Sequence, residues 1–247
     1  CNDNPLAFPG SPEYTKYYFL EILNLADNII IPHTSYINFI PENFRSEVAI
    51  IANGVDYELF QKPVITPQTL KKIKKPIIMY IGAISDWFDF QIIRNAAENT
   101  GYNFVLIGPV SLSMKAEINL LTVNERITYL DSIAHEQIPN YLSKADLCII
   151  PFVKNKLTES VLPNKMFEYA AAGKSCVMTE FNPSLKEFSD YVSIASNTEG
   201  FISEINQRIN TVIPSDRMKS FAKKYDWSMI SKKYYESLEA IILTSNN

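Results

Sequence analysis

The residues best suited to chemistry lie at the start of a short predicted helix, residues 164–172. Pro163 fits the first position of a helix, and Gly173 fits the position just past its end. Lys165 and Glu168 are three positions apart, so we expect their side chains to project from one face. The unpaired amides and the dipole at a helix N-terminus attract an anion, and Lys165 adds a full positive charge. Glu168, one turn further along, can accept two hydrogen bonds from a vicinal diol.

Two interpretations fit the pair formed by Lys165 and Glu168. A nucleoside diphosphate would place its diphosphate at the helix start and its ribose beside Glu168. An ordinary ion pair on a solvated helix face has the same spacing, and such pairs are common. The chain has seven glycines among 247 residues, and neither a Gly-x-Gly-x-x-Gly dinucleotide loop nor a Walker A loop is present. Nucleotide binding would therefore depend on the helix start rather than on a glycine-rich loop.

Short apolar runs rich in β-branched residues alternate with amphipathic stretches along most of the chain. Most of these runs are continuous, which is typical of parallel strands covered on both faces. Their order predicts an open α/β fold, a Rossmann-like parallel sheet flanked by helices. The expected strands are residues 28–32, 47–51, 76–81, 103–107, 126–130, 146–151, 175–179 and 191–194. The expected helices are residues 88–98, 136–143, 164–172 and 198–209, with Asp86 as the N-cap of the first.

Several segments, in order and at plausible spacing, resemble the C-terminal lobe of GT-B glycosyltransferases. They are YIGAI at residues 80–84, LIGP at 106–109, IPNYLSKAD at 138–146, IPF at 150–152 and PNKMFEY at 163–169. Upstream, ADNII at 26–30 and NGVD at 53–56 resemble the end of the N-terminal lobe of the same enzymes. The chain most resembles the retaining family-four or "group 1" enzymes that build bacterial surface polysaccharides. The resemblance implies a GT-B type fold with one complete lobe and part of a second.

Together with a turn- and proline-rich break at residues 53–75, the resemblance divides the chain into three segments. Residues 1–60 would form the end of the N-terminal, acceptor-binding lobe and the linker. Residues 61–225 would form the C-terminal lobe that binds the nucleotide sugar, and residues 226–247 a helix that crosses back to the first lobe. The helical stretch 214–243 has an apolar stripe formed by Phe221, Tyr225, Trp227, Ile230, Tyr234, Leu238 and Ile241. The chain would then be a fragment of a longer enzyme.

The resemblance also assigns roles to the helix start and to the first strand–helix turn. Glu168 would hold the ribose, and Lys165, beside Pro163 and Asn164, would meet the diphosphate. Lys165 and Glu168 are therefore the catalytic candidates on the nucleotide-sugar side. Gly82 would let phosphate or sugar approach the turn, because it has no side chain.

Further candidates fall at the carboxyl ends of strands, where such sheets bind ligands. Gly108, Pro109, Asp131 and Ser132 would seat the nucleobase. Many of the enzymes that the chain resembles carry a second Glu, separated by seven residues from the one that binds ribose. Ser160 occupies that position here, with Glu159 one residue away, and the segment ending at Thr158 would replace the missing sugar contact.

The resemblance implies transfer of a sugar from a nucleoside diphosphate sugar, with UDP-sugars as the expected substrates. The acceptor would be a glycan or a lipid-linked acceptor in surface polysaccharide synthesis, with retention of configuration and neither a metal ion nor a cofactor. A net charge of -4 offers no basic surface for a nucleic acid. No apolar run approaches the roughly 18 residues that span a bilayer. We expect a cytoplasmic protein, which a lipid-linked acceptor would bring to a membrane surface.

Two other functions stay open: a non-catalytic nucleotide- or sugar-binding α/β module, and a GT-B sugar-nucleotide epimerase. A self-contained module would fold the C-terminal apolar stripe onto its own lobe. A transferase lobe would direct the stripe towards a second lobe.

Overall fold

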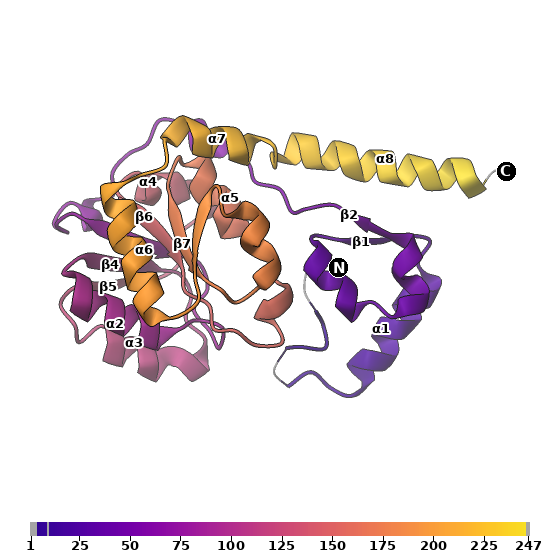
Figure 1. Cartoon of the computed structure of the whole chain (residues 1–247), viewed down its shortest axis with the longest axis horizontal. Coiled ribbons are helices and arrows are strands. Elements are labelled where there is room, and N and C mark those ends of the chain that lie inside the picture. The colour runs from indigo at the N-terminus through magenta and orange to yellow at the C-terminus, as the bar shows by residue number, and fades with distance from the viewer. Residues whose placement is uncertain (1–3, 9, 246–247) are drawn as a thin grey trace.

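The computed structural model describes residues 4–8 and 10–245, which form a small and a large unit (Figure 1). A linker, residues 51–76, joins the two units. The outermost residues of the predicted segments 1–60 and 226–247 lie outside this range. The small unit contains helix α1 (Tyr14–Leu25) and two parallel strands, β1 (Ile29–Ile31) and β2 (Val48–Ile50). Its core is separate from that of the large unit and is built from Phe19, Leu23, Ile29, Ile31, Tyr36 and Ile40.

The large unit contains a six-stranded, fully parallel sheet in the order β5-β4-β3-β6-β7-β8. Its strands are β3 (Ile77–Ile81), β4 (Asn103–Ile107), β5 (Ile127–Leu130), β6 (Leu147–Ile150), β7 (Cys176–Thr179) and β8 (Val192–Ala195). Every predicted strand is present, because the continuous apolar runs are those that two layers of helices must cover. The α/β fold class is therefore confirmed.

Helices cover both faces of this sheet (Figure 1). They are α2 (Phe90–Thr100), α3 (Lys115–Leu121), α4 (Ile138–Leu142), α5 (Asn164–Ala171), α6 (Thr198–Asn210) and α7 (Ser215–Lys223). Helix α2 contacts α3 and α6, whereas α5 packs against α7. Short 3-10 helices fill the connections: η1 (Thr34–Phe39), η2 (Glu42–Glu47), η3 (Glu58–Gln61), η4 (Gln68–Leu70), η5 (Leu112–Met114), η6 (His135–Gln137), η7 (Thr158–Ser160) and η8 (Pro183–Phe188).

The prediction that Asp86 caps the first helix of the large unit was wrong. Helix α2 begins later, and the Asp89 carboxylate accepts the cap hydrogen bond from the Ile92 amide at 2.9 Å. The residues before it form a turn, in which the Phe88 amide donates to the Ser85 carbonyl at 2.8 Å, and the Asp89 amide then donates to the Pro151 carbonyl at 2.8 Å. This pairing binds the loop after β3 to the loop after β6.

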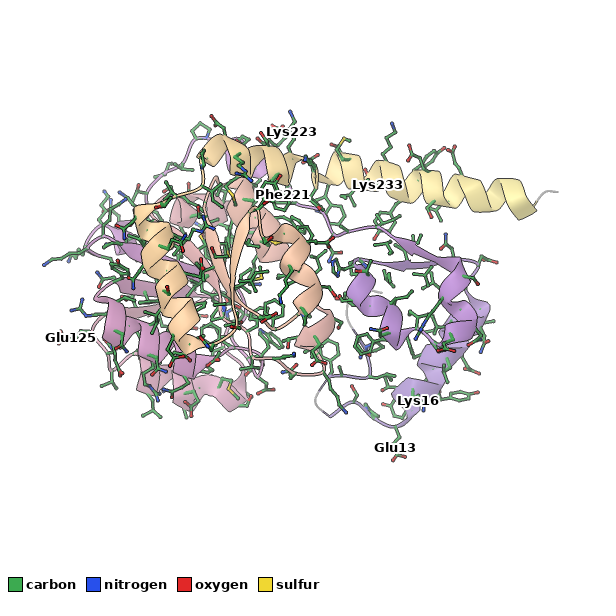
Figure 2. The ribbon with its side chains drawn as sticks, viewed as in Figure 1. Glu13, Lys16, Glu125, Phe221, Lys223 and Lys233 are labelled. Atoms are coloured by element: carbon green, nitrogen blue, oxygen red, sulfur yellow. The ribbon has the colours of Figure 1, made fainter. Side chains whose placement is uncertain are left out.

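The C-terminal stretch is two helices rather than one, α7 and α8 (Trp227–Ser245). The linker is bonded to the backbone at this break: the Val55 amide donates to the Tyr225 carbonyl, and the Trp227 amide donates to the Val55 carbonyl. Phe221 faces inward beneath α7, whereas Lys223 lies on its outer side (Figure 2). Helix α8 then extends over the small unit, where Asn28 donates a side-chain hydrogen bond to Ser237 at 3.1 Å (Figure 1). The side chain of Ile241 lies outside the described part.

The strand order places a topological switch point between β3 and β6. The chain proceeds from β3 to β4 and β5 on one side, and then crosses to β6 on the other. In open parallel sheets, ligands bind in the crevice outside the carboxyl ends of the strands at such a point. The residues that follow β3 and β6 are therefore the first place to look for a site.

Candidate functional site

The turn after β3 and the start of α5 meet at this crevice. Gly82 follows β3 directly, and the Lys165 side chain lies over it: a Cβ on Gly82 would be 1.9 Å from Lys165 Cε. The Lys165 ammonium lies 5.8 Å from the centroid of the Tyr80 ring. Gly82 has φ +153, a conformation that favours glycine. The structure thus brings two sequence-predicted residues, Gly82 and Lys165, into contact.

The glycine turn after β4 continues this row along the sheet edge. A Cβ on Gly108 would lie 2.2 Å from the Gly82 carbonyl oxygen, so the two turns pack backbone against backbone. The Pro109 carbonyl accepts a hydrogen bond from the Ile84 amide at 2.8 Å. The Tyr129 hydroxyl, near the end of β5, donates to the Gly108 carbonyl at 3.0 Å. The turns after β3 and β4 are therefore held by backbone bonding.

Asp131 and Ser132 follow β5 at the far end of the row, and both are exposed. The Asp131 carboxylate accepts a hydrogen bond from the Ser132 amide at 2.7 Å, which closes the turn. Asp131 lies within 3.5 Å of the Tyr129 hydroxyl that also contacts Gly108. The predicted nucleobase residues thus form one connected group across β4 and β5.

Lys165 and Glu168 do not form the ion pair that their spacing allows. Within the described part of the chain, neither side chain has a hydrogen bond or an ion pair within 4.0 Å. Burial lowers the pKa of Lys165, with Glu168 acting in the opposite direction. Burial raises the pKa of Glu168, and Lys165 and His135 oppose this shift. Two largely desolvated groups of opposite charge therefore lie one turn apart on α5 without a hydrogen bond or an ion pair.

Next to Lys165 lies a cavity of about 300 Å³. Of the predicted residues, Thr158, Pro163, Asn164 and Lys165 line it. Gly82, Gly108, Pro109, Asp131, Ser132 and Glu168 do not line it; they belong to the row along the sheet edge or to the next turn of α5. The site therefore has two parts, the edge row and this cavity, which meet at Lys165.

Of the lining residues that were not among the predicted site residues, two carry polar side-chain groups, Trp87 and Asn53. Trp87 comes from the loop after β3, where its indole donates to the Ala83 carbonyl at 3.3 Å. Asn53 comes from the linker and is 8% exposed. A signal was present for Asn53, because an Asn–Gly pair begins two residues after the end of a predicted strand, but such a pair ordinarily marks a turn.

Hydrogen bonds from side-chain hydroxyls to backbone carbonyls hold the segment between β6 and α5. Thr158 lines the cavity, but its hydroxyl donates a hydrogen bond to the Val153 carbonyl at 2.6 Å. Ser160 is fully buried, and its hydroxyl donates to the Leu157 carbonyl at 3.0 Å. Glu159 is exposed and does not line the cavity. The position where related enzymes are expected to carry a glutamate is therefore structural in this chain.

The small unit contacts the same segment through a network that the sequence did not predict. The Ser35 hydroxyl donates to the Ser160 carbonyl at 3.0 Å and accepts from the Asn182 amide at 3.1 Å. His33 pairs through Nε2 with Glu187, while its Nδ1 accepts from the Ser35 amide at 3.2 Å. These bonds join the end of β1 to the chain that leads into α5.

Residues 4–8 and 10–245 contain no cluster of three or more His, Cys, Asp or Glu side chains placed to hold a metal ion. Across the same residues, no helix combines the length and the apolar character that a membrane span requires.

Comparisons with known proteins agree with this architecture. The family model described as "Glycosyl transferases group 1" matches residues 75–224. A Bacillus subtilis (strain 168) protein named "Putative teichuronic acid biosynthesis glycosyltransferase TuaH" is 28% identical over 151 residues. That match covers 60% of this chain, and the chain spans 38% of the length of TuaH.

Two solved structures show the likeness in fold. Anabaena HepE in complex with UDP and glucose superposes with a TM-score of 0.76 at 15% identity, covering 93% of this chain and 68% of HepE. A mutant of S. aureus TarM in complex with fondaparinux, alpha-GlcNAc-glycerol and UDP gives a TM-score of 0.66 at 13% identity, covering 96% and 49%. The expected GT-B type fold is confirmed. The family match spans more than half of the residues, and the chain belongs to the group 1 family of glycosyl transferases.

Proposed function

We propose that this chain forms the part of a glycosyltransferase that binds a nucleoside diphosphate sugar. Residues 61–225 supply the binding lobe, residues 1–60 the end of the acceptor lobe with the linker, and residues 226–247 the helix that returns to that lobe. The whole enzyme transfers the sugar to a glycan or a lipid-linked acceptor in surface polysaccharide synthesis. The observation that carries the proposal is the contact of Lys165 with Gly82 at the switch point, with the Glu168 carboxylate free one turn away.

The row along the sheet edge supports a defined orientation of the nucleotide. Gly108, Pro109, Asp131 and Ser132 lie at the ends of β4 and β5 and would seat the base. Glu168 lies near the β5 side, because His135 of the loop after β5 acts on its carboxylate. The ribose would bind there and the diphosphate between Lys165 and Gly82. UDP is the preferred nucleotide, since HepE and TarM are both described with UDP.

The proposed reaction requires stabilisation of the departing diphosphate. Charge builds on its oxygens as the bond to the sugar breaks, and preorganised donors in a desolvated site stabilise such charge strongly. The N-terminus of α5 presents the free backbone amides of Asn164 and Lys165, and the Lys165 side chain adds a charge with little water around it. Burial removes much of the water that would otherwise stabilise the Lys165 ammonium. A bound diphosphate would replace that lost hydration with a direct attraction between opposite charges.

The C-terminal helices favour a transferase over a self-contained binding module. Helix α7 packs on its own lobe, as a module would require, but α8 leaves that lobe and bonds to Asn28 in the small unit. Under the transferase proposal the protein works in the cytoplasm and meets a membrane surface through a lipid-linked acceptor. A sugar-nucleotide epimerase would use the same nucleotide site but would need no acceptor.

Calorimetry with UDP and uridine tests the nucleotide site. We expect UDP to bind the wild-type chain much more tightly than uridine, and Lys165→Ala to remove most of that difference. A charge-assisted hydrogen bond contributes about 1.5–3 kcal/mol, so UDP affinity should fall about 10- to 100-fold. Equal losses for UDP and uridine would contradict the phosphate role. Failure to bind UDP or GDP at millimolar concentration would reject the proposed function.

A further inference from the structure

The linker residue Asn53 is an exception among the buried polar residues of the structure. It is 8% exposed, yet its side chain has no hydrogen-bond partner among the described residues. Each of the other buried polar residues described forms at least one side-chain hydrogen bond. The buried side-chain atom that lacks a partner among the described residues is Asn28 Oδ1, so the Asn53 amide keeps contact with solvent and its hydrogen-bonding groups are free for a ligand.

The place of Asn53 indicates which ligand could reach it. Asn53 lines the cavity beside Lys165, together with Trp87 and Phe152. Backwards along the chain from Glu168, Lys165, Asn164 and Pro163 come first, and four more residues that line the cavity follow: Leu162, Val161, Thr158 and Leu157. A nucleotide with its ribose at Glu168 and its diphosphate at Lys165 therefore directs whatever its terminal phosphate carries into this cavity.

The chemistry of the lining suits a sugar. The aromatic rings of Trp87 and Phe152 provide apolar walls for the C–H faces of a pyranose. A primary amide has two N–H donors and a carbonyl acceptor, so Asn53 can bind adjacent hydroxyl groups that both donate and accept. The position at which related enzymes are expected to carry a glutamate cannot serve here, because the Ser160 hydroxyl is bonded to the Leu157 carbonyl.

We propose that Asn53 binds a hydroxyl group of the sugar carried by the nucleoside diphosphate. The inference rests on the proposed function and adds that the linker between the lobes takes part in sugar recognition. The linker is held closely enough for this role: a Cβ on Gly54 would lie 2.5 Å from the Trp227 ring. The Val55 backbone is bonded on both sides to residues 225 and 227. Asn53 is thus presented from a fixed backbone.

The test compares UDP with UDP-glucose by calorimetry on the full chain, or GDP with GDP-mannose if the wild type binds that pair. We expect Asn53→Ala to weaken binding of the nucleotide sugar about three- to tenfold and to leave the affinity for the nucleoside diphosphate within twofold. Glu58→Ala, an exposed substitution in the same linker, is the matched control and should change neither affinity. If Asn53→Ala does not fold, Asn53→Ser replaces it, since serine suits turns and lacks the reach of the amide.

Three outcomes overturn the inference. Equal losses for the two ligands would make Asn53 a structural residue of the linker, and no loss for either would remove it from the site. If the wild-type chain binds no nucleoside diphosphate, the proposed function fails and the role of Asn53 fails with it. Under either of the first two outcomes, with the nucleoside diphosphate still bound by the wild type, only the sugar contact is wrong and the proposed function stands.

Discussion

The Lys165 side chain occupies the space that any side chain at position 82 would need, because a Cβ on Gly82 would lie 1.9 Å from Lys165 Cε and 2.4 Å from its Nζ. Gly82→Ala should therefore displace the ammonium from the crevice and also strain the backbone at φ +153. We expect UDP affinity to fall about tenfold, measured by calorimetry.

A matched control separates displacement of Lys165 from backbone strain. Gly101 ends α2 with φ +71, and a Cβ there would meet only Arg126, at 4.0 Å. Gly101→Ala should lower the unfolding temperature without changing UDP affinity. If both alanine variants bind UDP equally well, Gly82 does not position Lys165.

The lowered pKa of Lys165 predicts how nucleotide binding depends on pH. The ammonium is charged below its pKa, and burial moves that pKa below the ordinary lysine value. UDP affinity should therefore begin to fall at a lower alkaline pH than an ordinary lysine would give. Calorimetric titrations of the protein with UDP between about pH 7 and pH 10 check this expectation. Lys165→Ala should bind UDP weakly and lack this decline, and an identical pH profile in the variant would assign the decline to another group.

The sequence predicted the sheet and the helix start well because both depend on local patterns. Continuous apolar runs gave every strand, and Pro163 with Gly173 gave the bounds of α5 closely. The contact of the linker with the break between α7 and α8 was not predictable in this way, because Val55 is distant in sequence from both helices. Asn53 and Ser35 escaped prediction for the same reason: their roles arise from contacts between units, which leave no periodic signal.

Glu168 should lower the stability of the empty protein while it serves nucleotide binding. Its pKa is raised by burial, so the folded state binds the proton more tightly than the unfolded state does. The resulting stabilisation exists at low pH and is lost as the pH rises through the raised pKa. At neutral pH, Glu168→Gln should therefore stabilise the empty chain by about 1 kcal/mol, or about 2–4 °C in the unfolding temperature. The difference in unfolding temperature between Glu168→Gln and the wild type should shrink as the pH is lowered.

Nucleotide binding should change in the opposite direction in the same variant. A neutral amide accepts weaker hydrogen bonds from a diol than a carboxylate does, so UDP and uridine should both lose affinity. Glu98→Gln, an exposed substitution on α2, should alter neither stability nor binding. A Glu168→Gln variant that is less stable than wild type and binds uridine unchanged would refute the assignment to ribose.

The small unit should hold the approach to α5 in place through Ser35. Its hydroxyl donates to the Ser160 carbonyl and accepts from Asn182, which also donates to the Val161 carbonyl at 3.2 Å. Ser35→Ala leaves a buried carbonyl without its partner, at a cost of about 1–3 kcal/mol. We expect faster hydrogen exchange in residues 157–165, read by mass spectrometry, and UDP binding about threefold weaker.

The exchange pattern distinguishes a local positioning role from a general loss of stability. Residues 77–81 and 103–107, the neighbouring strands β3 and β4, should keep their protection in Ser35→Ala, because they lie in the other unit's core. Ser46→Ala, an exposed serine substitution in the small unit, should leave both exchange and UDP binding as in the wild type. Uniformly faster exchange across the sheet would instead show that Ser35 stabilises the whole chain. If residues 157–165 exchange no faster than in the wild type, the contact between Ser35 and Ser160 does not position the start of α5.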